Sequence, residues 1–235
     1  MSQQAIIIWG MGEVGGVLAR AVLKSGYPVL PVTRDIDAHA LAEDLPDPEM
    51  VIIAVGENDL GEVLKSCPAS WLSRLVLIQN ELLPRNWLGL PQPTVMSVWF
   101  EKKKGQDVKV VMPSILFGSY AHILIDALAR LDIPANEVDS PEALEFELIA
   151  KNMYILTTNL CGLKTGGTVQ ELRNQHSEYM NRVFDDILQI QQALVGHELD
   201  RDALMKRILE AFDGDPDHPC KGRSAPQRLE RALKQ

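Results

Sequence analysis

Cysteine is scarce in this chain of 235 residues, and its scarcity excludes whole classes of protein. The three cysteines, Cys67, Cys161 and Cys220, are too few and too scattered for a disulfide framework. No two of them form the C-x-x-C pair typical of zinc and redox sites. His218 and Cys220 lack a second nearby pair of metal ligands. We therefore expect reduced thiols and no metal site.

Basic charge and long apolar runs are also in short supply. Lys and Arg total 23 against 32 Asp and Glu, a net charge of −9 that would repel a nucleic-acid backbone. The longest uncharged apolar stretches, residues 5–12 and 75–80, are far shorter than the ~20 residues of a membrane span. The N-terminus has no basic segment typical of a signal peptide. We expect a cytoplasmic protein with no nucleic-acid or membrane partner.

The first half of the chain alternates strand and helix patterns. Short apolar runs typical of buried parallel strands occur at residues 5–9, 29–33, 51–55 and 75–79. Helical patterns separate them at residues 13–24, 38–43 and 59–65. This order predicts an α/β protein with an N-terminal Rossmann-type doubly wound sheet. Two further strands are expected at residues 94–101 and 106–112, joined by a charged segment that we interpret as a solvated hairpin tip.

From Pro141 onward, helical periodicity replaces the strand-like runs and predicts an all-helical C-terminal domain. We place a dinucleotide-binding domain at residues 1–139 and a helical substrate or dimerisation domain at residues 140–235. The first helix of the second domain is expected to begin at Pro141 and to stop at Gly162 and the glycine pair 166–167. The capping box at residues 168–171 predicts a long helix to about Val195. Further helices are expected at residues 200–212 and near the C-terminus.

A phosphate-binding motif lies where the first strand meets the first helix. Gly10-Met11-Gly12-Glu13-Val14-Gly15 has the spacing G-x-G-x-x-G, and its placement between strand and helix would aim backbone N–H groups at a pyrophosphate. Gly10 would allow the tight turn, Gly12 would let the phosphate approach, and Gly15 would let helix and strand pack closely. The alternative is a strand-to-helix turn that binds nothing.

The end of the second strand is where such domains select between NAD and NADP. Thr33 and Arg34 stand there, and a guanidinium suits the 2′-phosphate of NADP. Two alternatives stay open. Asp35 would place a carboxylate at the same position if the strand ended one residue later, and Arg34 could be a solvated loop residue.

The first helix of the second domain carries a candidate catalytic stripe. Lys151, Ile155 and Asn159 lie at i, i+4 and i+8, about 12 Å along one helix face. A lysine in this apolar stretch would have a lowered pKa and could give a proton to a carbonyl oxygen. An exposed lysine and a helix-surface asparagine are the alternative.

Taken in order, these motifs resemble the ketopantoate reductases (2-dehydropantoate 2-reductases) as far as about Leu209. The resembling landmarks are the glycine turn, Arg34, Gln79-Asn80 after the fourth strand, Lys151 with Asn159, and the turn at residues 166–172. The resemblance implies NADPH as cofactor, with Asn80 beside its nicotinamide end. It also implies that Lys151 protonates the carbonyl oxygen of a 2-oxo acid while Asn159 orients the substrate.

The chain departs from that family at four places. Ile155 replaces an asparagine, Gly56 a lysine and Glu81 a glycine, and no glutamate follows Gly222-Arg223. We therefore predict an NADPH-dependent oxidoreductase that acts on a small 2-oxo acid or related carbonyl and could form a homodimer. The alternative is a non-catalytic NADP-binding regulator or scaffold. Ile155 makes the predicted pocket less polar and favours apolar 2-oxo acids over hydroxylated ones.

Overall fold

The computed structural model describes residues 3–234, which form two compact units. The first unit ends at Glu145 and the second begins at Phe146. Within the described residues, every helix is either too short or too polar to cross a bilayer.

The first unit is built on a seven-stranded sheet in the order β2-β1-β3-β4-β5-β8-β9. Its strands are β1 (Ile6–Trp9), β2 (Val29–Val32), β3 (Met50–Ile53), β4 (Leu75–Leu77), β5 (Thr94–Ser97), β8 (Ser114–Phe117) and β9 (Ala135–Glu137). Strands β1 to β5 run parallel, and β8 pairs antiparallel with β5 and parallel with β9. Because β2 and β3 pair with opposite sides of β1, the winding direction reverses at β1.

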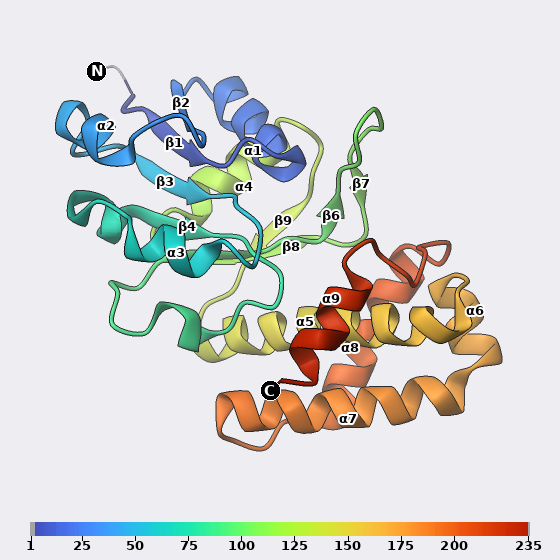
Figure 1. Ribbon diagram of the computed structural model, residues 1–235. Coiled ribbons are helices and arrows are strands. Elements are labelled where there is room, and N and C mark those ends of the chain that lie inside the picture. Colours follow the sequence, from blue (N-terminus) through green and yellow to red (C-terminus); the bar gives the residue numbers. More distant parts are fainter. Residues whose placement is uncertain (1–2, 235) are drawn as a thin grey trace. The chain divides into compact units, whose positions relative to one another are not determined.

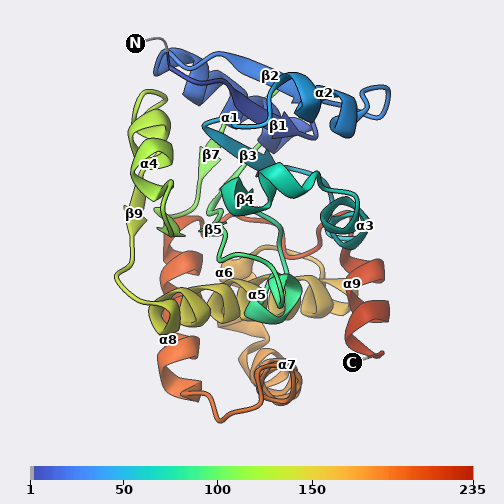
Figure 2. The ribbon, with the colours of Figure 1, turned by 90° about the vertical axis from the view of Figure 1, so that its left-hand side faces the viewer.

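Helices cover both faces of this sheet. They are α1 (Glu13–Lys24), α2 (Ala38–Asp44), α3 (Leu60–Lys65) and α4 (Ala121–Ala129), with 3-10 turns at Ala69–Arg74 and Pro84–Trp87. The α1 and α4 helices pack together on one face, and Figure 2 shows α4 and α3 on opposite sides of the strands. The apolar face of α1 is buried against β1, β3 and α4. The predicted doubly wound α/β fold is confirmed.

The strand predictions need three corrections. The β2 strand is a partly exposed edge strand rather than a buried one, which is where Pro31 is tolerated. Residues 94–101 are two strands, because the chain leaves the main sheet after Ser97 and Phe100–Glu101 (β6) pairs with Lys109–Val110 (β7) in a separate hairpin. The third correction adds two strands, β8 and β9, which the sequence pattern does not predict. The β9 strand lies at the edge of the sheet, is mostly exposed and contains few apolar residues.

The second unit is helical, as predicted, and consists of α5 (Pro141–Thr165, from Phe146 onward), α6 (Val169–Gln175), α7 (Ser177–Val195), α8 (Arg201–Gly214) and α9 (Ala225–Ala232). Figure 1 shows α7 running back alongside α5. Side-chain contacts tie α7 and α8 to α5: Gln191 of α7 accepts a hydrogen bond from Asn152, Arg207 of α8 pairs with Glu147, and Tyr154 meets Phe212 of α8 edge to face.

Two helix boundaries differ from expectation. Gly162 does not stop α5, because it lies inside the helix and makes room for the backbone of residues 220–221; a Cβ there would lie 2.7 Å from the Lys221 nitrogen. The helix ends at Gly166 and Gly167, which adopt φ values of 63° and 69°. The predicted helix to Val195 is broken at His176, where no glycine or proline gives a sequence signal.

Candidate functional site

At the turn between β1 and α1, three backbone segments lie close together: the turn itself, the end of β2 and the end of β3. Gly10 has a φ of 102°, and its nitrogen donates a hydrogen bond to the Val32 carbonyl at 3.0 Å. A Cβ on Gly10 would lie 2.7 Å from the carbonyl oxygen of Ala54, at the end of β3. Any side chain at residue 10 would therefore push β3 away from β1 where the winding direction of the sheet reverses.

The other two motif glycines have different roles. A Cβ on Gly15 would overlap the carbonyl oxygen of Gly10, so the helix can lie this close to the turn only with glycine there. Gly12 caps α1 without a side-chain hydrogen bond, and a Cβ on it would meet no atom within 4 Å. Open space therefore lies beside Gly12 at the start of α1, where backbone N–H groups have no intrahelical acceptor. This geometry fits a pyrophosphate.

The flanking motif residues lie at this helix end. Met11 is exposed at 44%, Glu13 is exposed in the first turn, and Val14 packs partly against the core. Glu13 places a carboxylate where the helix end favours negative charge.

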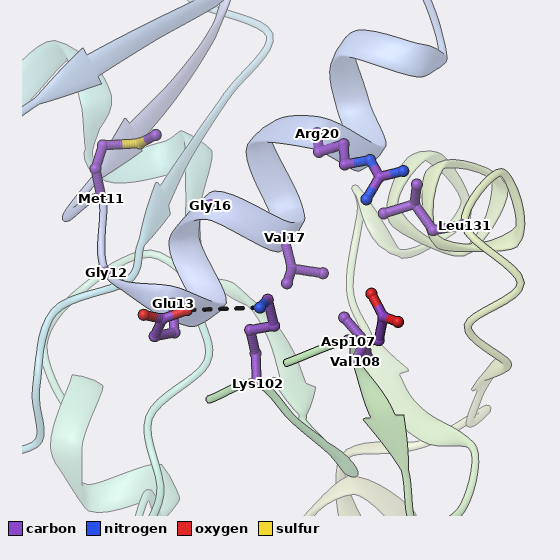
Figure 3. A pocket seen from close by; sticks show the side chains of 10 residues that line it. All are labelled: Met11, Gly12, Glu13, Gly16, Val17, Arg20, Lys102, Asp107, Val108 and Leu131. Carbon is purple, nitrogen blue, oxygen red and sulfur yellow. Dashed lines mark ion pairs between the residues drawn. The ribbon is translucent and has the colours of Figure 1, made fainter. Parts of the chain in front are cut away.

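A pocket of about 420 Å³ opens beside Gly12 (Figure 3). Its walls come from the glycine turn, the first half of α1, the β6–β7 hairpin and Leu131. Lys102 extends from the hairpin toward Glu13, and its Nζ lies 3.9 Å from the Glu13 Oε2. The same ammonium donates to the carbonyl oxygens of Lys103 and Gln106.

The predicted solvated hairpin tip is confirmed at residues 103–107, which are exposed, and Lys102 is the exception. The Lys102 side chain is only 24% exposed, because it folds back over the tip and pairs with α1. Beside the proposed pyrophosphate position, its charge offsets that of Glu13.

Thr33 and Arg34 follow β2 directly, next to the glycine turn. Trp9 and Val32 are paired in register, so the residues after each strand are neighbours. Both Thr33 and Arg34 are exposed, in a turn closed by a 3.1 Å hydrogen bond from the Ile36 nitrogen to the Thr33 carbonyl. Arg34 can therefore reach a ligand held at the glycine turn.

Asn80 follows β4 and is held by the loop after β3. Its Nδ2 donates to the Glu57 Oε1 at 2.9 Å. The buried Gln79 beside it donates to the carbonyls of Ile53 and Val55, which ties the ends of β3 and β4 together. Glu81 has a φ of 59°, a left-handed conformation that favours glycine.

In the second unit, α5 carries Lys151, Ile155 and Asn159. Lys151 is partly buried, with its Nζ 5.7 Å from the centre of the Tyr154 ring. Ile155 and Asn159 are each 7% exposed, so the stripe after Lys151 is not a solvated helix surface. The alternative for Asn159, an exposed polar residue, is therefore wrong.

Asn159 meets residues from the end of the chain. Its Oδ1 accepts a hydrogen bond from the Arg228 Nη1 at 3.1 Å. A Cβ on Gly222 would lie 2.9 Å from the same oxygen, so glycine at that position leaves room for the pair. Neither Arg228 nor Lys102 stands out in the sequence, because each becomes significant only through a partner far along the chain.

The cysteines are free thiols and are all buried. Burial raises the pKa of Cys161 to about 12 and that of Cys220 to about 11. A thiol with so high a pKa is a poor nucleophile at neutral pH, so neither thiol near Asn159 in the fold supplies reactive chemistry.

The fold is shared with solved structures of reductases. The chain has a TM-score of 0.67 and 13% identity to 2-dehydropantoate 2-reductase from Methylococcus capsulatus, covering 98% of this chain and 89% of that one. For a dimeric ketopantoate reductase from Staphylococcus aureus the values are 0.59, 17%, 97% and 85%. The chain has the fold of the ketopantoate reductases.

The same fold occurs in an enzyme named for a different substrate. D-mandelate dehydrogenase, solved in a ternary structure with NADH and anilino(oxo)acetate, matches with a TM-score of 0.62 and 14% identity over 91% of this chain and 81% of that one. In sequence, neither a family model nor a curated protein matches this chain. The predicted resemblance is therefore confirmed at the level of the fold.

Proposed function

We propose that this protein is an NADPH-dependent reductase of small 2-oxo acids. The observation that carries the proposal is the glycine turn, where Gly10 and Gly15 bring strand and helix together and Gly12 leaves open space at the helix N-terminus. Proteins that share the fold include ketopantoate reductases and a D-mandelate dehydrogenase solved with NADH. A nicotinamide dinucleotide is the ligand that both observations favour.

In this proposal the first domain, residues 1–139, holds the cofactor. Its contacts come from the turn at residues 10–15, from Thr33 and Arg34, and from Asn80 near the nicotinamide. The exposed Arg34 supports NADPH over NADH, because a guanidinium can bind a 2′-phosphate through charge-assisted hydrogen bonds.

The second domain, residues 140–235, holds the substrate and provides the surface for a homodimer in this cytoplasmic enzyme. When bound, the reduced nicotinamide supplies a hydride to the carbonyl carbon. The Lys151 ammonium gives its proton to the carbonyl oxygen as negative charge develops there, which completes the alcohol. Asn159 orients the substrate from two turns further along α5.

The second candidate is an NADP-binding protein without catalysis. Ile155 favours it, since this buried apolar side chain stands between Lys151 and Asn159 where the family's asparagine would supply a hydrogen bond.

One experiment separates the two functions. NADPH is titrated into the protein and its fluorescence followed, and pyruvate, 2-oxobutanoate, phenylglyoxylate and ketopantoate are then added in turn while NADPH consumption is measured. Turnover of any of these acids, lost in Lys151→Met, supports the reductase. Tight NADPH binding without turnover supports the non-catalytic protein, and no binding of NADPH or NADH contradicts both.

A further inference from the structure

The β6–β7 hairpin brings a positive charge to the start of α1 from a distant part of the sequence. Strands β1 to β5 run parallel, so β5 ends at the same edge of the sheet as the glycine turn after β1. The chain leaves β5 at Ser97 and forms β6 three residues later, so the hairpin starts from this edge. Lys102 follows β6 and extends toward Glu13, the first residue of α1 (Figure 3). An ammonium therefore lies beside the helix end at which the pyrophosphate is proposed to bind.

The Lys102 ammonium is held by the hairpin and keeps one donor for an anion. Of its three N–H donors, two are used by the carbonyl oxygens of Lys103 and Gln106 in the hairpin tip. The Glu13 Oε2, at 3.9 Å, is too far for a hydrogen bond, so this contact is an ion pair only. Within residues 3–234 the ammonium makes no further hydrogen bond. One N–H group and the positive charge are therefore available to a ligand.

The pocket beside Gly12 gives an anion room to reach this ammonium. Its volume is about 420 Å³, and both Gly12 and Lys102 line it. A Cβ on Gly12, or on Gly16 one turn further along α1, would meet no atom within 4 Å, so this side of the helix is open. Arg20 also lines the pocket, but it lies seven residues after Glu13, about 10 Å along the helix. Lys102 is therefore closer than Arg20 to the helix start.

The start of α1 needs a positive charge because the side chain there is acidic. The Glu13 carboxylate suits the N-terminal end of a helix, but it repels a phosphate bound to the backbone N–H groups of the same turn. The chain as a whole, with a net charge of −9, adds to this repulsion. The Lys102 side chain is 24% exposed, so solvent screens its charge less than that of a fully solvated lysine. It can therefore offset the repulsion by Glu13.

We propose that Lys102 binds the pyrophosphate of the cofactor, which makes the β6–β7 hairpin part of the cofactor site. This inference rests on the proposed function and adds a binding residue that lies far from the glycine motif in the sequence. An ammonium binds phosphate oxygens as a point charge, through charge-assisted hydrogen bonds. NADPH and NADH both contain the pyrophosphate, so Lys102 contributes equally to the binding of the two. Arg34, in contrast, is proposed to contact the 2′-phosphate that only NADPH carries.

The experiment measures the binding of both cofactors by fluorescence titration at low and high ionic strength. In Lys102→Met, we expect the affinities for NADPH and NADH to fall by the same factor, roughly 10- to 100-fold at low ionic strength, and by less as salt is added. Lys102→Arg keeps the charge and should recover part of the affinity. Unchanged affinities in Lys102→Met, or a loss for only one of the two cofactors, would overturn the inference.

Lys104→Met is the matched control, because Lys104 is an exposed lysine of the same hairpin tip. It should bind both cofactors like the wild type. An equal loss in Lys104→Met would show that the net charge of the tip attracts the cofactor without a contact from Lys102, and would overturn the inference. If melting curves show that Lys102→Met is unfolded, Lys102→Gln replaces it, because glutamine removes the charge and can still donate to the carbonyls of the tip.

Glu13→Gln tests the opposing charge. Removing the carboxylate ends its repulsion of the phosphate and its ion pair with Lys102, so the affinities for NADPH and NADH should both rise severalfold. A fall in both affinities would show that the ion pair itself, and not the ammonium, supports the site, and would contradict the assignment of Lys102 to the phosphate.

Inorganic pyrophosphate separates this inference from the reductase function. Titration followed by phosphorus NMR should show binding by the wild type that weakens in Lys102→Met and not in Lys104→Met. Cofactor or pyrophosphate binding that depends on Lys102, without turnover of any 2-oxo acid, contradicts only the reductase. A wild type that binds neither pyrophosphate nor a dinucleotide overturns the phosphate site together with the proposed function.

Discussion

The β1–α1 turn and the face of α5 place their functional groups in different ways. At the turn, the site is formed by backbone atoms. Gly10 and Gly15 are required there, because a side chain on Gly10 would collide with the backbone after β3 and one on Gly15 with the carbonyl oxygen of Gly10. On α5, side chains do the work, and Asn159 depends on Arg228, 69 residues further along the chain. A local motif therefore describes the first site almost completely and the second only in part.

The largest effect is expected from a substitution on α5, the second of these two regions. Lys151→Met removes the proposed proton donor, and general acid catalysis contributes about 10²- to 10⁴-fold, so kcat should fall by that factor. Lys164→Met is the control on the same helix, where the Lys164 Nζ lies 4.7 Å from the centre of the Tyr179 ring. Steady-state kinetics with NADPH and phenylglyoxylate measure both variants. Equal rates for Lys151→Met and wild type would remove Lys151 from the mechanism.

The next prediction tests whether Gly15 of the β1–α1 turn serves stability while Gly12 serves cofactor binding. Gly15→Ala forces a methyl group onto the Gly10 carbonyl oxygen and should reduce the free energy of unfolding by about 1–3 kcal/mol. Gly12→Ala meets no atom, so it should leave stability nearly unchanged and weaken NADPH binding roughly 10- to 100-fold by blocking the phosphate.

Gly61→Ala is the control for these glycine variants. Residue 61 lies in α3, and a methyl group added there would meet no atom within 4 Å. Alanine should therefore stabilise the helix by up to about 1 kcal/mol without affecting NADPH binding. Urea unfolding and fluorescence titration check the three variants. A Gly12→Ala protein that binds NADPH normally would contradict the phosphate site.

The same contrast explains what could be predicted from the sequence. The parallel strands and the glycine turn were predictable because apolar runs and glycine spacing are local signals. The break of the helix at His176 has no glycine or proline to mark it. The edge strand Ala135–Glu137 follows Pro134 but contains no apolar run, so its sequence does not read as a strand. Gly162 is a misleading signal, because a glycine late in a helix usually indicates its end. Here the absent side chain lets α5 pack closely against residues 220–221, and the helix continues.

Within the candidate site, residues close together in the sequence could be predicted, and residues whose partners are distant in the sequence could not. Lys151 and Asn159 share one helix, so their spacing was enough to propose them together. Lys102 and Arg228 contact Glu13 and Asn159 only because the chain folds back over long distances. Charge patterns alone describe both as ordinary surface residues.

A smaller effect concerns the choice of cofactor beside the glycine turn. Arg34→Ala removes the proposed contact with the 2′-phosphate, and NADPH affinity should fall roughly 10- to 100-fold while NADH affinity stays nearly constant. Titrating both cofactors into wild type and variant measures the ratio. An equal loss for NADPH and NADH would make Arg34 a structural residue of the turn.

The smallest effect is expected after β4, where the prediction tests whether the backbone conformation of Glu81 contributes to cofactor binding. Glu81 has a φ of 59°, so Glu81→Gly should relieve strain and raise the free energy of unfolding by about 1 kcal/mol in urea titrations. Asp132→Gly is the control: Asp132 has a φ of 58° in the turn before β9, and since Asp tolerates this conformation better than Glu, its gain should be smaller. If Glu81 also positions Asn80 for the nicotinamide, only Glu81→Gly will weaken NADPH binding. Unchanged NADPH binding in both variants would show that the strained backbone at residue 81 does not serve the cofactor, and would limit backbone-determined binding to the β1–α1 turn.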